Sequence, residues 1–104
     1  MKGICLQIFV HENQKHQDML AYEWILKKAQ QLQISGGTAF SSIASFGRHG
    51  IMHAEHFFEI PKDNSIAVIF FLTEEKCEEF LQILKKSDIS FFHCKWQAEF
   101  EKNG

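Results

Sequence analysis

Two stretches of this chain are apolar at both odd and even positions, and they limit its architecture more than any other feature. Residues 4–10 read ICLQIFV, and residues 66–72 read IAVIFFL. β-Branched and aromatic residues dominate both stretches, which is typical of strands. Successive side chains of a strand point to opposite faces of its sheet. Both strands are therefore expected to be covered on both faces.

Two amphipathic helices are expected between the strands. Asp18 is the predicted N-cap of the first helix, whose apolar residues recur at three- and four-residue spacing as far as Leu32. Thr73 is the predicted N-cap of the second helix, and acidic residues follow it as the helix dipole favours. The apolar stripe of the second helix consists of Cys77, Phe80, Leu81 and Leu84.

Three more segments are predicted to be extended. Residues 38–46 and 51–60 flank a turn at 47–50, and residues 90–100 alternate between apolar and polar side chains. Residues 11–17 are predicted to form a loop. The chain thus predicts one α+β domain over 1–104 with the order βαββαβ, in which an antiparallel sheet carries both helices on one face. Because two helices cover only one face, a second copy of the chain is the expected cover of the other face.

Composition excludes several classes of function. The 104 residues carry 11 basic and 13 acidic side chains, interspersed along the sequence, so no basic cluster predicts binding to nucleic acid. No apolar run approaches the roughly 18 residues needed to span a bilayer. The N-terminal residues lead directly into the first strand without a signal-peptide pattern, so the expected location is the cytoplasm. The three cysteines are predicted to be reduced thiols, with Cys94 in the core.

Catalytic and metal-binding patterns are weak. No nucleophile elbow, phosphate-binding loop or zinc-finger spacing is present, so we expect no enzymatic activity and no cofactor. His49, His53 and His56 have the spacing of metal ligands on a helix. In an extended segment, however, His56 would point away from the other two. A ring of one histidine from each subunit of an oligomer is easier to build.

Short motifs along nearly the whole chain resemble the PII-like signalling proteins, the short relatives of the nitrogen-regulatory PII proteins known as domain-of-unknown-function family 190. The motifs are Leu6–Glu12, Ala21–Ile25, Gly36-Gly37-Thr38, Ser45-Phe46-Gly47-Arg48 and Thr73–Lys76. The resemblance implies a ferredoxin-like protomer that forms a trimer with its sheets inward. It also implies adenine-nucleotide binding between subunits and regulation of a partner protein, often a membrane transporter.

The same resemblance implies which residues bind the ligand. Gly36, Gly37 and Thr38 would lie against the base, and Gly47 and Arg48 would lie near the phosphates. The PII proteins also hold phosphates in a glycine-rich loop before the last strand, whereas this chain has Lys85–Ile89 there, without glycine. AMP or ADP is therefore the expected ligand in place of ATP.

Other interpretations of these residues stay open. Gly36-Gly37 also suits a helix C-cap followed by a turn, and Gly47-Arg48 suits a solvated turn. Glu12 is either a solvated loop acid or a site residue. At the level of function, the alternatives are a metal-binding or metal-tolerance trimer of the same fold and a structural interaction module.

Overall fold

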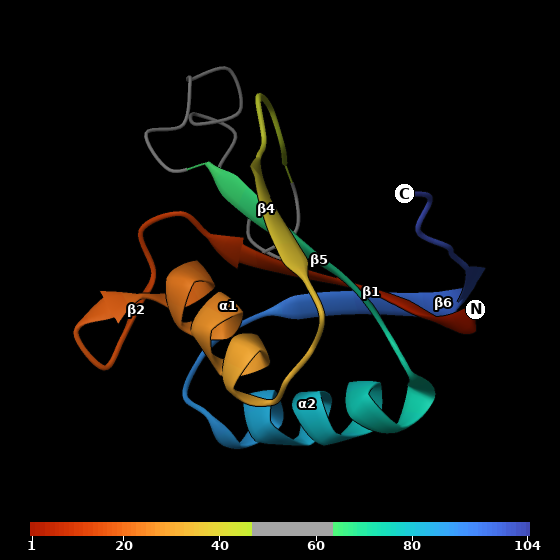
Figure 1. Ribbon diagram of the computed structural model, residues 1–104. Coiled ribbons are helices and arrows are strands. Elements are labelled where there is room, and N and C mark those ends of the chain that lie inside the picture. Colours follow the sequence, from red (N-terminus) through yellow and green to blue (C-terminus); the bar gives the residue numbers. More distant parts are fainter. Residues whose placement is uncertain (47–63) are drawn as a thin grey trace.

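A four-stranded antiparallel sheet carries both helices on one side (Figure 1). This computed structural model describes residues 1–46 and 64–104, and the predicted turn at 47–50 and extended segment at 51–60 lie outside them. The strand order is β4-β5-β1-β6. The strands are β1 (Lys2–His11), β4 (Gly37–Ser41), β5 (Ser65–Leu72) and β6 (Phe92–Glu99), and the helices are α1 (Ala21–Gln31) and α2 (Glu74–Lys86). The predicted α+β class with two helices on one face is confirmed.

The core lies between the helices and one face of the sheet. Alternate residues of β1 and β5 face the helices, and cross-strand pairs such as Ile8 with Val68 are buried. Phe70 of β5 meets Phe80 of α2 edge to face, with ring centroids 5.1 Å apart. All four residues of the predicted α2 stripe are buried, and Thr73 Oγ1 accepts the N-cap hydrogen bond from the Lys76 amide at 3.2 Å. Both predictions for this helix are confirmed.

Neither helix covers the opposite face of the sheet, which we call the open face. The strand register places its side chains in three rows. The rows are Phe40, Ala67, Phe9 and Phe92, then Thr38, Ile69, Gln7 and Cys94, then Phe71, Cys5 and Trp96. Four large rings on this face are about half exposed, namely Phe40 at 55%, Phe71 at 47%, Phe92 at 55% and Trp96 at 47%. The predicted two-sided apolar strands thus leave an aromatic surface without helical cover.

The last strand carries its apolar side chains away from the helices. Its register with β1 pairs Lys95 with Leu6 on the helical side and places Cys94 on the open face, half-buried. The prediction that Cys94 lies in the core was wrong. Alternation of apolar and polar residues shows only that the two faces of a strand differ. The pairing register decides which of these faces meets the helices.

A short hairpin replaces the predicted loop before α1. Strands β2 (Lys15–His16) and β3 (Met19–Leu20) pair across a two-residue turn in which Gln17 and Asp18 have φ values of 52° and 66°. Positive φ at both positions is the geometry of a tight hairpin turn. Asp18 is therefore a turn residue, and the predicted cap was wrong: α1 begins after Leu20 without a side-chain cap.

The C-terminus of α1 is closed by a residue in the left-handed conformation. The Gln33 amide donates to Gln30 O and the Ile34 amide to Ala29 O, both at 3.0 Å, while Gln33 has a φ of 63°. This pair of hydrogen bonds is the Schellman motif, in which glycine usually takes the position of Gln33. The interpretation of Gly36-Gly37 as the helix C-cap is therefore wrong.

Replacing Gln33 by glycine is expected to stabilise the fold. The left-handed conformation costs a residue that has a Cβ roughly 1–2 kcal/mol, and glycine avoids this cost. Glycine also loses more backbone entropy on folding, which offsets part of the gain. We therefore expect a net stabilisation of about 0.5–1 kcal/mol. Urea unfolding of Gln33→Gly at fixed protein concentration measures the gain. Gln30→Gly, inside the helix, is the matched control and should destabilise by about 1 kcal/mol. Equal losses in both variants would contradict the assignment.

Candidate functional site

The predicted base-binding residues lie at one edge of the sheet. Gly36 precedes β4, Gly37 opens this strand, and Thr38 pairs with Ile69 on the open face. The edge position leaves this run accessible from both sides of the sheet, and a hollow lies on each side. Gly36 and Gly37 line both hollows.

The hollow on the helical side has a volume of about 480 Å³ and is bounded by α1. Glu23, Lys27 and Gln30 provide its polar wall, while Leu26 and Phe70 provide apolar surface. Opposite charges stand along one helix here, which is a common arrangement on a solvated helix face. This hollow has no feature that singles out one class of ligand.

The hollow on the open face has a volume of about 420 Å³ and a more selective lining. Its walls are Phe40, Ile69 and Phe71, and Thr38 adds a hydroxyl beside the backbone of Gly36 and Gly37. Within residues 1–46 and 64–104, no charged side chain lines it. Aromatic rings with a few polar groups suit a flat, uncharged ring system such as a nucleobase. We refer to this hollow as the base hollow.

The two glycines differ in what a side chain would meet. A Cβ on Gly37 would overlap the Phe70 ring and come within 3.2 Å of Leu26 Cδ2. A Cβ on Gly36 would meet nothing within 4 Å. Packing against Phe70 therefore explains glycine at 37, whereas Gly36 borders open space. A side chain at position 36 would extend into the open space beside the two hollows.

The predicted phosphate-contacting residues, Gly47 and Arg48, lie outside the described residues. The chain on either side of them is held by hydrogen bonds. The Ser42 amide donates to Ser65 O at 2.8 Å, and the Ser65 amide donates to Ser42 Oγ at 3.0 Å. The Asn64 amide donates to Glu12 Oε2 at 3.1 Å, so this carboxylate holds the chain in place instead of standing free in solvent.

In the segment that replaces the glycine-rich loop, the backbone amides of Ser87 and Ile89 are already occupied. After α2 ends at Lys86, the Ser87 amide donates to Leu84 O at 3.1 Å and the Ile89 amide donates to Ser87 Oγ at 3.2 Å. These donors are therefore not available to phosphate oxygens. Lys86 lines a hollow beside Trp24 and Lys28, and it lines neither hollow at Gly36. Within one subunit, the structure does not bring Lys86 to the base hollow.

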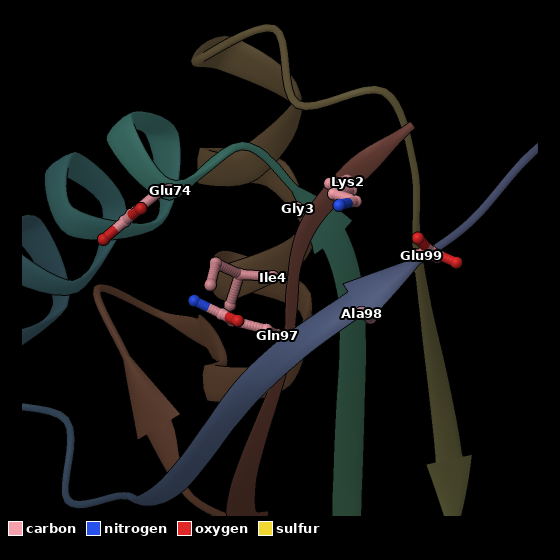
Figure 2. Close-up of a pocket in the computed structure, with 7 residues that line it drawn as sticks. All are labelled: Lys2, Gly3, Ile4, Glu74, Gln97, Ala98 and Glu99. Atoms are coloured by element: carbon pink, nitrogen blue, oxygen red, sulfur yellow. The ribbon is translucent and has the colours of Figure 1, made fainter.

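A further hollow, of about 410 Å³, lies where the start of β1 meets the end of β6 (Figure 2). Glu74 comes from the first turn of α2, Lys2 and Glu99 from strand ends, and Gln97 lies beside Ile4. Acidic residues such as Glu74 are favoured at a helix N-terminus because they stabilise the helix through its dipole, whether or not a ligand binds nearby. No sequence motif marked this hollow, and its mixed charges do not select a ligand.

The described ranges 1–46 and 64–104 contain no cluster of three or more potential metal ligands, and His49, His53 and His56 fall outside them. Burial raises the pKa of the Cys5 thiol, and Cys94 adds to this shift. Burial likewise raises the pKa of Cys77. A raised pKa keeps a thiol protonated and a poor nucleophile. Within those ranges no helix is long and apolar enough to cross a membrane.

Comparison with known proteins agrees with this architecture. A curated relative, a UPF0166 protein of Aquifex aeolicus (strain VF5), is 26% identical over 85 residues, which cover 82% of this chain and 81% of the relative. Among solved structures, the CPII protein of Thiomonas intermedia K12, bound to ADP, AMP and acetate, matches with a TM-score of 0.51 and 13% identity. The match covers 96% of this chain and 93% of that one, and it supports a ferredoxin-like, PII-like fold.

The family itself is shown by a match over most of the sequence. Residues 3–88 match the DUF190 family model, described as "Uncharacterized ACR, COG1993". This range runs from the first strand through both helices and includes the Gly36-Gly37-Thr38 run at the base hollow. The chain therefore belongs to the DUF190 family and has a PII-like fold.

Proposed function

We propose that this protein is a PII-like regulatory protein without enzymatic activity. In this proposal it forms a homotrimer, binds AMP or ADP in the clefts between subunits, and signals the bound state to a partner protein in the cytoplasm. A membrane transporter is the kind of partner that the family resemblance implies. The nucleotide acts as a ligand and not as a cofactor.

The observation that carries the proposal is the position of the base hollow. It opens on the same face that presents four half-exposed aromatic rings. Burying a large apolar side chain contributes about 1.5–3 kcal/mol, so covering this face by neighbouring subunits would be strongly favoured. A neighbour seated there would also close the base hollow at Thr38, Phe40 and Phe71. Assembly and ligand binding thus share one surface.

One comparison and one sequence resemblance support the proposal. The CPII protein, which shares the fold, was solved with ADP and AMP. The run Gly36-Gly37-Thr38, which resembles the motif that lies against the base in PII-like proteins, lines the base hollow. Arg48 follows in the sequence as the cation required near the phosphates, because a guanidinium binds phosphate with two parallel hydrogen bonds.

A thermal-shift comparison tests the proposal directly. The protein is heated with AMP, ADP, ATP, inorganic phosphate or a divalent metal salt, each at the same concentration. A ligand present at a hundred times its Kd stabilises the folded state by about 2.7 kcal/mol, so we expect a clear rise in Tm with AMP and ADP. A rise with the metal salts alone would favour the metal-binding alternative. No rise with any nucleotide would overturn the proposal.

Arg48→Ala is expected to weaken nucleotide binding by about 1.5–3 kcal/mol, the usual contribution of a hydrogen bond to a charged group. The mass of the oligomer should not change. Titration calorimetry measures the affinity, and Lys102→Ala, which removes a positive charge near the C-terminus, is the control. Equal nucleotide affinities for Arg48→Ala and the native protein would show that Arg48 does not contact the nucleotide.

AMP or ADP is expected to bind at least as tightly as ATP, with little dependence on magnesium. The amides of Ser87 and Ile89 are hydrogen-bonded within the turn after α2, so this segment offers no cradle for a third phosphate. Calorimetric titrations of the three nucleotides, with and without magnesium, rank the affinities. A strong preference for ATP that depends on magnesium would show that other residues bind the γ-phosphate.

A further inference from the structure

A groove on the helical side of the molecule has no role in the proposed nucleotide site. Two adjoining hollows of about 210 and 300 Å³ share Gln17, Trp24 and Lys28. The first extends along α1 past Lys27, and the second extends to Lys86 at the end of α2. We call the two together the hairpin groove, since the turn of the β2–β3 hairpin forms one wall. Figure 1 shows this hairpin beside α1.

The base of the hairpin groove is built around a fixed aromatic ring. Trp24 Nε1 donates to Gln17 Oε1 at 3.3 Å, and the His16 ring meets the indole edge to face with centroids 4.7 Å apart. Lys28 Nζ lies 5.3 Å from the centre of the indole ring, within the range of a cation–π contact. The hairpin, which the sequence pattern did not predict, thus holds Trp24 in a defined orientation at the surface.

The hairpin groove is positively charged although the chain as a whole is acidic. In the part of the chain that the structure describes, three lysines line it, Lys27, Lys28 and Lys86, against a single acid, Asp88. Lys86 lies far from the pair Lys27-Lys28 in the sequence, so a search for basic runs does not find all three together. The fold brings them to one surface, and Met19 and Ile83 add apolar contacts beside Trp24. The surface therefore suits a ligand with several negative charges and at least one apolar group.

The charged groups favour an acidic polypeptide over a phosphate. Lysines are flexible point charges and do not form the bidentate contacts that arginine makes with phosphate. The C-terminus of α2, where Lys86 lies, carries the negative end of the helix dipole, which opposes a concentrated anion. Carboxylates spaced along an extended segment match cations that are spread along two helices. The groove also lies on the side opposite the open face, so an oligomer assembled through that face leaves it accessible.

We propose that the hairpin groove binds an acidic linear segment of a partner protein. Carboxylates of the segment would pair with Lys27, Lys28 and Lys86, and an apolar side chain between them would contact Trp24. This contact would anchor a partner independently of whether nucleotide is bound at the base hollow.

The two tryptophans of the chain allow a site-resolved test, because Trp24 lies in the groove and Trp96 on the open face. The probe is a synthetic peptide in which glutamates flank a central phenylalanine, added to the native oligomer while the two indole N–H resonances are followed by NMR. We expect the Trp24 resonance to shift to saturation and the Trp96 resonance to stay in place. Raising the salt concentration should weaken the binding.

Charge-reversal variants decide whether the groove itself binds the peptide. Lys27 and Lys86 are exposed, so Lys27→Glu and Lys86→Glu should leave the fold intact and each weaken binding at least about tenfold. Lys2→Glu and Lys102→Glu are the controls and should have little effect. An unmoved Trp24 resonance, or equal losses in test and control variants, would overturn the proposal. So would inorganic phosphate or ADP shifting Trp24 as effectively as the peptide.

Discussion

Ile69→Asp is expected to convert the native oligomer into monomers, whereas Val68→Asp is expected to prevent folding altogether. The two residues are adjacent on β5 but point to opposite faces of the sheet. Val68 is fully buried in the core beneath the helices, and Ile69 lies in the middle row of the open face. Burying an unpaired carboxylate is very costly. At position 68 the carboxylate would be buried in every folded molecule, whereas at position 69 it would be buried only when the open face is covered by another subunit.

Light scattering and circular dichroism separate the two outcomes. The native protein should have the mass of a trimer, and Ile69→Asp should have the mass of a monomer with unchanged secondary structure. Gln82→Asp, on the exposed side of α2, is the control and should remain trimeric. A native protein that is monomeric in dilute solution would contradict the role of the open face. A trimeric Ile69→Asp would show that assembly uses another surface.

Gly37→Ala is expected to destabilise the protein by about 1–3 kcal/mol, the usual cost of forcing an extra methyl group into a packed core. The added Cβ would overlap the ring of Phe70, which is itself buried and packed edge to face against Phe80. Gly36→Ala should leave stability almost unchanged, because its Cβ would enter open space. Chemical unfolding of the two variants at equal concentration measures this difference.

A larger residue at the open position separates structure from binding. Gly36→Val should fold normally but weaken nucleotide binding, because its side chain stands at the border of the base hollow. If Gly36→Val binds nucleotide as the native protein does, the Gly36-Gly37 run serves only packing. If Gly37→Ala is as stable as the native protein, the close contact with Phe70 is not what requires glycine.

The sequence predicts most of the fold because its strongest patterns are local. The apolar strands at 4–10 and 66–72 coincide with the centre of the sheet, and the cap at Thr73 depends only on a residue and its near neighbours. The order of these elements then leaves few arrangements for a chain of this length. Because both central strands are apolar on both faces, the sequence also predicts that both faces of the sheet must be covered.

Other features depend on pairings that periodicity does not reveal. The hairpin turn uses Gln17, a residue with no preference for positive φ, and Gln33 stands where glycine is usual. The face to which Cys94 points is set by the register between β6 and β1. In the hairpin turn and in the facing of Cys94, pairing between strands decides the outcome over local preference.

The candidate site was predictable in part. The run Gly36-Gly37-Thr38 was found from its resemblance to a family motif, and the structure places it at the base hollow. Packing against Phe70 as the reason for Gly37 could not be predicted, because the two residues are far apart in the sequence. The hairpin groove could not be predicted from the sequence either, because its lysines come from two helices that are far apart in the sequence.

Titration calorimetry of the native oligomer with AMP and ADP tests the central claim most directly, since it reports both affinity and stoichiometry. If the base hollow is completed by a neighbouring subunit, each nucleotide should bind with saturable heat at one molecule per subunit. The monomeric Ile69→Asp, in which a wall of the base hollow is altered as well, should then give no heat. Absence of heat from the native protein with AMP, ADP and ATP alike, or equal binding by the native oligomer and the Ile69→Asp monomer, would contradict a nucleotide site between subunits.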